Sequence, residues 1–285
     1  MSGSIGKPSS LTIGSRAFNW GERTYIMGVI NVSPDSFSGD GLADVEAAVA
    51  QGRRFAEEGA DILDVGGQST RPGFEELTVE EETARVVPVI ERLAAELDVP
   101  VSVDTYKAGV ARAALAAGAH LLNDIWGFRR EPALAALAVE YDVPAVVMHN
   151  QRSREFRDVI GDISSGLQAS IAIAEEAGLA RERLIIDPGF GFGWTTEQNL
   201  EMLRRLGELR QLNLPLLVGT SRKSAIGAVL DDAPVGERLL GTAATVALAI
   251  AAGADIVRVH DVAEQRQVAR VADAVVRGGE ADGLP

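Results

Sequence analysis

The sequence predicts an α/β fold, namely a (β/α)8 TIM barrel with an N-terminal β-hairpin across the barrel bottom. Three observations predict it. Short runs of Val, Ile and Leu alternate with longer amphipathic stretches, there are eight such runs, and 285 residues suit a barrel of roughly 250 residues. Continuous apolar runs are typical of parallel strands buried on both faces, and the intervening helices then supply right-handed crossovers.

Each apolar run ends in polar residues or glycine, which predicts where the strand stops. By this criterion the strands span residues 25–30, 61–65, 101–103, 120–122, 145–148, 184–186, 216–218 and 255–259. An open, doubly wound sheet is the alternative architecture. That fold usually carries a Gly-rich turn after its first strand, and the pattern G-x-G-x-x-G does not follow Ile30.

Helical signals fill the intervals between the strands. Residues 44–58 have apolar side chains at helical spacing, and the stretch 77–97 begins with Thr78, followed three residues later by Glu81. That spacing is typical of a capping box at a helix N-terminus. Further helices are predicted at residues 107–117, 131–141, 160–178, 196–211, 237–252 and 262–277.

Residues 11–24 precede the first barrel strand and predict the short hairpin across the barrel bottom. No stretch is long enough to act as a linker between domains. Residues 1–285 are therefore interpreted as one domain with a core at about 11–277, and the tail 278–285 is expected to be disordered.

The composition excludes several classes of function. A formal net charge of −14 disfavours nucleic acid and anionic membranes as partners, and an anionic substrate then needs a local basic patch. The absence of cysteine excludes disulfides, thiol nucleophiles and Cys-ligated zinc. Residues 1–10 lack the apolar stretch of a signal peptide, and no run approaches the ~20 apolar residues of a membrane helix. We therefore expect a cytoplasmic protein that acts on small molecules.

Polar or ionisable residues follow every predicted strand. In TIM barrels the chemistry lies at the carboxyl ends of the strands. Any one of these residues alone is explained as a helix cap or a turn residue, but eight groups at one rim favour an active site. In strand order they are Asn31, Gln68, Asp104, Asn123, His149, Asp187, Lys223 and the pair Arg258 and His260.

These residues suggest two kinds of binding. Asp104, Asn123 and Asp187 offer hydrogen-bond acceptors and a donor that suit a flat heterocycle with an amino-pyrimidinone edge. The basic residues of the last two strands lie where TIM barrels often bind phosphate, and an arginine there can also stack on a flat ring. The basic residues are Lys223, Arg258 and His260.

Each residue also has a simpler interpretation. Asp104 can cap the following helix, Arg258 can pair with Asp187, and His260 can be a structural histidine. Lys223 can form a Schiff base, as in a phosphate-binding lyase. The residue pattern alone leaves these alternatives open.

Specific motifs lie at these strand ends, including Asn-Val-Ser-Pro-Asp-Ser-Phe after the first strand and Ser-Thr-Arg-Pro-Gly after the second. The motif Ser-Arg-Lys follows the seventh strand, and Arg-Val-His-Asp lies at the eighth. In order and spacing these segments, with VSVDT (101–105), LLNDIWG (121–127), VVMHN (146–150) and IIDPGFGFG (185–193), resemble the dihydropteroate synthase family over about residues 11–277.

The resemblance implies a Mg²⁺-dependent transferase of folate biosynthesis. Such an enzyme joins 6-hydroxymethyl-7,8-dihydropterin diphosphate to p-aminobenzoate, releases pyrophosphate, is a target of sulfonamides and works as a homodimer. The resemblance also implies a set of pterin-binding residues, with the arginine stacking on the ring: Asp104, Asn123, Ile125, Met148, Asp187, Lys223 and Arg258.

The remaining implied roles concern the diphosphate, the metal, the second substrate and catalysis. Asn31, Thr70, Arg258 and His260 would hold the diphosphate, with Asn31 as the Mg²⁺ ligand. The p-aminobenzoate site and its two loops would comprise Asp35, Phe37, Thr70, Arg71, Pro72, Phe192 and Ser221. The catalytic residues would be Lys223, Arg258, Asp104 and His260.

Three departures from the family pattern stand out. Glutamate is frequent where this chain has Gln68, an aromatic residue is frequent where it has Ala225, and the stretch after His149 differs from the common form. The first and third of these bear on loop closure. Two other functions remain as alternatives: a non-catalytic pterin-binding paralogue, and a methyltetrahydrofolate-binding methyltransferase domain that needs no loop at Asn31–Phe37.

Overall fold

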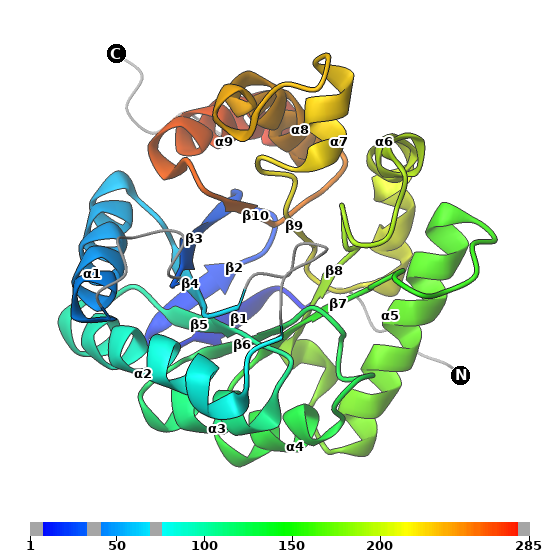
Figure 1. The fold of residues 1–285 in the computed structure, drawn as a ribbon. Coiled ribbons are helices and arrows are strands. Elements are labelled where there is room, and N and C mark those ends of the chain that lie inside the picture. Colours follow the sequence, from blue (N-terminus) through cyan, green and yellow to red (C-terminus); the bar gives the residue numbers. More distant parts are fainter. Residues whose placement is uncertain (1–7, 33–40, 69–75, 279–285) are drawn as a thin grey trace.

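Eight parallel strands surrounded by helices form the body of the molecule in a computed structural model; Figure 1 looks into the barrel from one end. The structure describes residues 8–32, 41–68 and 76–278, without the side chains of 41–44. The barrel strands are β3 (Tyr25–Asn31), β4 (Ile62–Gly66), β5 (Val101–Asp104), β6 (Leu121–Asp124), β7 (Ala145–Met148), β8 (Leu184–Asp187), β9 (Leu217–Val218) and β10 (Ile256–Val259).

The strands pair in parallel in the order β8-β7-β6-β5-β4-β3-β10-β9. A single parallel bridge between Ile186 and Leu216 joins β8 to β9 and closes the ring. The predicted TIM barrel is therefore confirmed, and each predicted strand agrees with an observed one within two residues at either end. The strand expected at 120–122 runs from Leu121 to Asp124, so Asn123 lies within β6 and does not follow it.

Helices surround the barrel and follow the predicted positions (Figure 1). They are α1 (Gly41–Glu58), α2 (Val79–Glu96), α3 (Ala108–Ala116), α4 (Ala133–Glu140), α5 (Val159–Glu176), α6 (Thr196–Arg205), α7 (Ser224–Val229), α8 (Leu239–Ala251) and α9 (Val262–Arg277). The predicted capping box is present, because Thr78 Oγ1 accepts from the Glu81 amide at 3.1 Å and Glu81 accepts from the Thr78 amide at 2.8 Å.

Two helical predictions need correction. The helix expected at 196–211 ends at Arg205 and continues as a 3-10 helix over Leu206–Leu212, where Gly207 has a low propensity for α-helix. The short helix α7 at Ser224–Val229 was not predicted, because a single turn-and-a-half after a strand leaves too short a pattern for helical periodicity. Among the described residues, no helix is both long enough and apolar enough to cross a membrane.

The N-terminal hairpin closes one end of the barrel, as predicted. Its strands β1 (Ser10–Ile13) and β2 (Arg16–Asn19) are antiparallel. Their apolar side chains pack with the lowest inward-facing residues of the barrel strands in one buried cluster, which contains Leu11, Ile13, Phe18, Trp20, Tyr25, Met27, Ile62, Leu121, Val146, Ile185, Leu217 and Ile256. The cluster fills the bottom of the barrel, so only the upper part of the interior can hold a ligand.

Candidate active site

The upper interior of the barrel is polar, because the strand residues that point inward at this height are mostly polar or charged. Residues two apart point to the same face of a strand. The outward-facing strand residues belong to the large apolar cluster under the helices. The lowest inward-facing residues belong to the apolar layer at the bottom of the barrel. One step above that layer, the inward positions are Asp64, Asp104, Asn123, Met148, Asp187 and Arg258. Five of these six are polar or charged, and they share one end of the barrel.

Arg258 lies at the centre of this layer and binds two carboxylates. Its Nε donates to Asp64 Oδ2 at 2.6 Å, and its Nη2 donates to Asp104 Oδ2 at 2.7 Å. The interpretation that Arg258 pairs with Asp187 is wrong, because its two ion pairs in the described structure are with Asp64 and Asp104. The interpretation of Asp104 as a helix cap is also wrong, because α3 begins without a side-chain cap and Asp104 is held by Arg258.

Burial changes the acidity of Asp104. Removal from water, opposed by the charge of Arg258 and supported by the charge of Asp64, raises the pKa of this carboxyl to about 7. Asp104 therefore releases its proton within the physiological pH range. An ionised Asp104 is the form that Arg258 stabilises.

A second pair, Asp187 and Lys223, lies across the interior. Asp187 Oδ1 accepts from the Gly189 amide at 2.7 Å, which fixes the turn after β8. Lys223 Nζ donates to the carbonyl of Phe190 at 2.9 Å. Burial raises the pKa of Asp187 to about 6 and lowers the pKa of Lys223 to about 8, and each charge favours the other's ionised form.

The turn after β8 depends on glycine at two positions. Gly189 has φ of +78°, and a Cβ there would lie 1.8 Å from the His149 carbonyl oxygen. Gly191 has φ of +83°, and a Cβ there would lie 2.9 Å from Lys223 Cδ. Only glycine readily adopts these positive φ values where neighbouring atoms leave no room for a Cβ. The two glycines therefore let the turn lie directly against Lys223.

An apolar wall borders the polar layer. Tyr106, Ile125 and Met148 form a buried cluster, and Phe192 and Trp126 pack against it. Lys223 Nζ lies 4.2 Å from the centre of the Phe192 ring, a cation–π arrangement. A flat ring that enters the barrel would therefore meet apolar side chains on its faces and polar groups at its edge.

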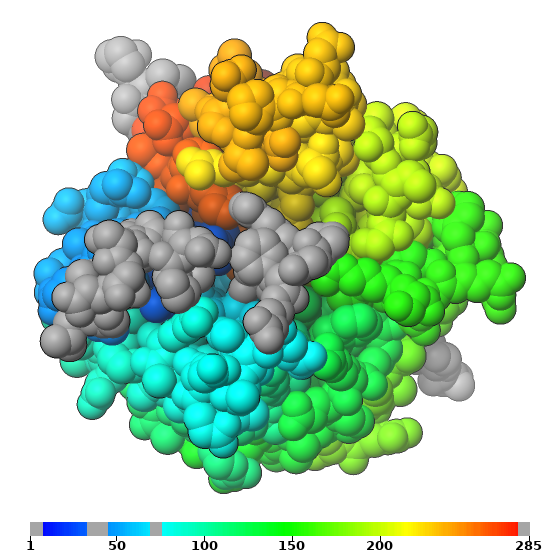
Figure 2. Space-filling model, viewed as in Figure 1, coloured from blue at the N-terminus to red at the C-terminus, as the bar shows by residue number. Residues whose placement is uncertain are grey.

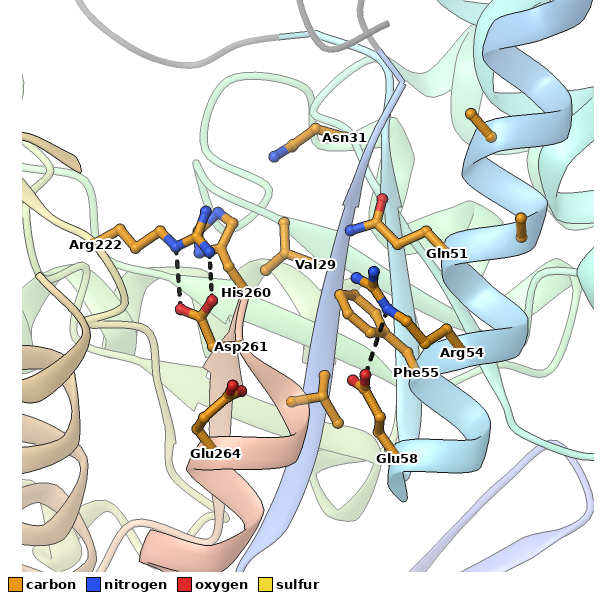
Figure 3. Close-up of a pocket in the computed structure, with 13 residues that line it drawn as sticks. Val29, Asn31, Gln51, Arg54, Phe55, Glu58, Arg222, His260, Asp261 and Glu264 are labelled. Atoms are coloured by element: carbon orange, nitrogen blue, oxygen red, sulfur yellow. Dashed lines mark hydrogen bonds and ion pairs between the residues drawn. The ribbon is translucent and has the colours of Figure 1, made fainter. Parts of the chain in front are cut away.

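A cavity of about 780 Å³ opens beside this layer, between α1 and the junction of β10 with α9 (Figure 3). Asn31 and His260, both predicted to hold the diphosphate, line it. Arg222, which the sequence did not single out, also lines it and is bound by Asp261. Gln51 and Arg54 of α1 face these residues from the opposite wall (Figure 3).

His260 is neutral in this environment. Burial and the neighbouring cations Arg258, Arg222 and Lys223 lower its pKa to about 3. Its Nδ1 lies 3.0 Å from Ser221 Oγ, which also accepts from the His260 amide. The expectation that His260 supplies positive charge therefore needs correction for the ligand-free site, where it offers hydrogen bonds instead.

Several predicted residues lie outside the described part of the chain. These are the loop residues Asp35, Phe37, Thr70, Arg71 and Pro72. Figure 2 shows the face above the barrel, bordered by α2 and α3 (cyan) on one side and by the α7–α9 segment (yellow to red) on the other. Of the p-aminobenzoate residues, Phe192 and Ser221 are described: the Phe192 ring lies against Lys223, and Ser221 lies beside His260.

Two buried charged residues were not identified from the sequence. Asp64 lies in the middle of an apolar run and is fully buried, and Lys107 is a buried cation at the start of α3. A charge inside an apolar run requires a partner, and this signal could have identified Asp64.

Gln68 has a defined place next to Lys107. The Lys107 ammonium donates to Gln68 Oε1 at 2.7 Å, to the Leu77 carbonyl at 2.6 Å and to Glu82 at 2.7 Å. Gln68 Nε2 in turn donates to the Tyr106 hydroxyl at 2.8 Å. A glutamate could accept from Lys107 but could not donate to Tyr106, so the amide suits this network.

We expect Lys107→Met to lower the free energy of unfolding by about 3–5 kcal/mol, because it leaves the buried Glu82 carboxylate without its cation. Urea denaturation followed by circular dichroism measures this change. Arg53→Met, which removes the exposed pair with Glu96, is the matched control and should change stability by less than about 1 kcal/mol. Equal losses in the two variants would contradict the prediction.

The comparisons with known proteins agree with this geometry. Residues 27–260 match the family model described as pterin binding enzyme. A dihydropteroate synthase from Clostridium beijerinckii is 49% identical over 269 residues, which cover 94% of this chain and 100% of that protein.

Two solved structures from Xanthomonas albilineans are also similar to this chain. The dihydropteroate synthase with 4-aminobenzoic acid is 43% identical with a TM-score of 0.89, covering 97% of this chain and 99% of that one. The complex with 7,8-dihydropteroate is 42% identical with a TM-score of 0.86, covering 97% of this chain and 100% of that one.

Fold, polar layer and family match together define a pterin-binding enzyme built on a TIM barrel. The Clostridium beijerinckii dihydropteroate synthase shares nearly half of its residues with this chain over almost the whole length of both, which identifies one family within this class of enzymes. The chain belongs to the dihydropteroate synthase family.

Proposed function

We propose that this chain catalyses the Mg²⁺-dependent condensation of 6-hydroxymethyl-7,8-dihydropterin diphosphate with p-aminobenzoate, giving 7,8-dihydropteroate and pyrophosphate for folate biosynthesis. One observation carries the proposal: Asp104, Asn123, Asp187 and Arg258 occupy the same inward layer of the barrel, with Lys223 beside them. This layer combines hydrogen-bond acceptors, fixed cations and an apolar wall within one interior.

The pterin ring would lie in that layer. Asp104, Asn123 and Asp187 would accept from the N–H groups of its amino-pyrimidinone edge, and Ile125 and Met148 would contact its faces. Arg258 would stack on the ring, because Asp64 and Asp104 fix the plane of its guanidinium. Lys223 would donate to a ring acceptor in addition to the Phe190 carbonyl.

The diphosphate would enter the cavity beside the layer. Asn31 and His260 line that cavity and would contact the phosphate oxygens, together with Thr70 and Arg258. Arg222 adds a guanidinium there, although Asp261 already neutralises much of its charge. His260 would act as a neutral donor until the anion binds, after which the negative charge favours its protonated form.

The donor set at the cavity fits a Mg²⁺ ion that arrives with the substrate. Mg²⁺ with a diphosphate usually takes only one or two protein oxygens, and phosphate oxygens and water complete its octahedron. Asn31 offers one amide oxygen at the cavity edge, and in the described part of the chain no cluster of three or more His, Asp or Glu forms an independent metal site. When bound, Mg²⁺ neutralises charge on the leaving diphosphate.

The chemistry replaces a carbon–oxygen bond by a carbon–nitrogen bond at the pterin methylene. Diphosphate leaves with the bonding electrons, and the arylamine nitrogen supplies the new pair and then loses a proton to water. Asp104 and Asp187 would stabilise positive charge on the ring as the diphosphate departs. No strong general base is needed, because an arylamine is already neutral at pH 7.

The second substrate would lie towards the rim of the barrel. Phe192, Ser221 and Lys223 would contact p-aminobenzoate, with the loops that carry Asp35, Phe37, Arg71 and Pro72 completing the site. Sulfonamides would compete at the same position.

Pyrophosphate release tests the proposal directly. Purified protein with Mg²⁺ and the pterin diphosphate should release pyrophosphate in proportion to dihydropteroate formed, and only when p-aminobenzoate is present. Tight binding of the pterin without any coupling would instead identify a non-catalytic pterin-binding paralogue. The cytoplasm is the location that we propose for this reaction.

A homodimer is part of the proposal, and the surface of α8 and α9 supports it. These two helices pack side by side (Figure 1), and a stripe of apolar side chains on them points outward: Leu240, Ala244, Leu248 and Ala251 on α8, and Val271 and Val275 on α9. Leu240 is 82% exposed and Val275 is 80% exposed. Contiguous exposed apolar groups of this kind mark protein interfaces, and a second copy of the chain is the partner that we propose.

We expect Leu248→Asp to convert a dimer into a monomer, because it buries a charge in the centre of that stripe. Light scattering coupled to size-exclusion chromatography measures the mass. Val139→Asp on α4 places the same charge at another exposed valine and should leave the dimer intact. A wild-type protein that is monomeric at micromolar concentration would contradict the proposed interface.

A further inference from the structure

Asp64 is buried beneath the proposed pterin site and has two partners in it. Its carboxylate is inaccessible to solvent, Oδ2 accepts from Arg258 Nε at 2.6 Å and from Asn123 Nδ2 at 3.0 Å, and Oδ1 has no partner among the described atoms. The proposed reaction assigns Asp64 no contact with a substrate. Its position between two substrate-binding side chains indicates that it acts through them.

The first effect of Asp64 concerns the plane of Arg258. A guanidinium is planar, and Asp64 and Asp104 bind different nitrogens of it. Two such contacts fix both the position of the group and its rotation, whereas one contact leaves rotation about a single hydrogen bond. Loss of Asp64 would therefore free the guanidinium to turn away from the face of the ring.

The second effect concerns the direction of the Asn123 carboxamide. An ionised carboxylate has no proton to donate, so Asn123 can present only its NH2 group to Asp64. The opposite orientation would place the amide oxygen against the carboxylate oxygen. Asn123 Oδ1 is thereby left as the atom available to a ligand.

The orientation of Asn123 has a consequence for specificity. With Oδ1 exposed, Asn123 adds an acceptor to those of Asp104 and Asp187. A ligand edge that presents consecutive N–H donors matches this set, and an edge with a carbonyl oxygen at the same place does not. Buried acceptors left without donors disfavour the wrong ligand strongly.

We propose that Asp64 is a positioning residue that orients Arg258 and Asn123 and so makes the site selective for a ring edge of N–H donors. The inference rests on the proposed function, since it assumes that the pterin occupies this layer. It extends that function by assigning part of the ring selectivity to a side chain that does not contact the ring.

Asp64 also influences Asp104 through its charge. The groups that act on Asp104 are Arg258, Asp64, Glu82 and Asp124, with Lys223 and Asp187 across the interior. Replacing Asp64 by a neutral residue removes a repulsive charge and leaves Arg258 with Asp104 as its remaining partner. The pKa of Asp104 should then fall, and activity that needs its ionised form should persist to lower pH.

Asp64→Asn tests the inference by calorimetric binding of two ligands, 6-hydroxymethylpterin and its analogue with an oxygen in place of the 2-amino group. The wild type should prefer the pterin by roughly tenfold or more. The variant should bind the pterin ~10- to 100-fold more weakly and lose most of the preference. The acid limb of its pH–kcat/KM profile should move to lower pH. Asp64→Ser should change both readouts in the same direction.

Asp124→Asn is the matched control. Asp124 is an equally buried aspartate two strands away, but it faces outward and accepts from the amides of Trp126 and Phe128. This control should lower the melting temperature without changing ligand preference. If the Asp64 variants lose stability but keep the wild-type preference and pH profile, Asp64 is only structural. Failure of the wild type to bind either ring would instead overturn the proposed function.

Discussion

Arg258→Ala is expected to lower kcat/KM for pyrophosphate release by about a thousandfold, the largest effect of any single change considered for this chain. Arg258 is the sole cation bound to both Asp64 and Asp104 in the described structure. Its loss removes the group proposed to stack on the pterin and to contact the diphosphate. It also leaves two carboxylates in the barrel interior without the cation that compensates their charge.

Two further variants separate the catalytic effect from a loss of stability. Arg277→Ala removes a comparably buried guanidinium that binds Asp273 on α9, and it should reduce stability while leaving turnover near the wild-type value. Arg258→Lys keeps the charge but lacks the planar fork that binds two carboxylates, and it should recover only a small part of the activity. Turnover of Arg258→Ala within tenfold of wild type would remove Arg258 from its proposed role.

Lys223→Met is expected to lower kcat/KM by about 100- to 1000-fold, because it removes the ammonium that faces Asp187 and the Phe192 ring. Methionine has a similar length and keeps the packing against the glycine turn. Steady-state pyrophosphate release measures the loss, and circular dichroism verifies the fold. Unchanged turnover would exclude Lys223 from the site.

The pH dependence of the wild type gives an independent check on Lys223. Its pKa is lowered to about 8, so the protonated donor is present below that value and is lost as the pH rises through it. Asp104 has a pKa raised to about 7, so its ionised form appears as the pH rises through that value. The kcat/KM profile should therefore be bell-shaped with limbs near these two values. Lys223→Arg, which stays protonated, should lose the alkaline limb, and persistence of that limb would indicate another group.

Borohydride treatment with substrate also distinguishes two roles for Lys223. A Schiff-base mechanism requires a neutral amine, whereas the ammonium here donates to the Phe190 carbonyl. No covalent adduct at Lys223 is expected in the mass spectrum of the treated protein. An adduct would support the lyase interpretation.

The sequence predicted which polar residues would meet at one end of the barrel, because they lie at the ends of strands. Asp104, Asn123, Asp187, Lys223 and Arg258 are polar residues next to apolar runs, and barrel topology brings all such positions to one end. Asn31 and His260 were predicted for the same reason, and both line one cavity. Their assignment to individual ligand atoms stays a prediction.

Asp64 shows what the strand-end criterion misses. It lies inside the buried run Ile62–Gly66 and not at its end, so only the presence of a charge in an apolar run marks it in the sequence. Its partner Arg258 is 194 positions away, and no local pattern connects the two. The network of Lys107, Gln68 and Glu82 was missed for the same reason, because its members come from three different segments.

The sequence by itself determined the strand count, the helical intervals, the hairpin and the family, because periodicity and motifs are local properties of the chain. Only the tertiary structure decided which charges compensate one another: that Arg258 binds Asp64 and Asp104, that His260 is neutral, and that Asp104 and Lys223 have shifted pKa values. Ionisation and hydrogen-bond direction depend on burial and on distances between residues far apart in the sequence, and both arise only when the barrel closes.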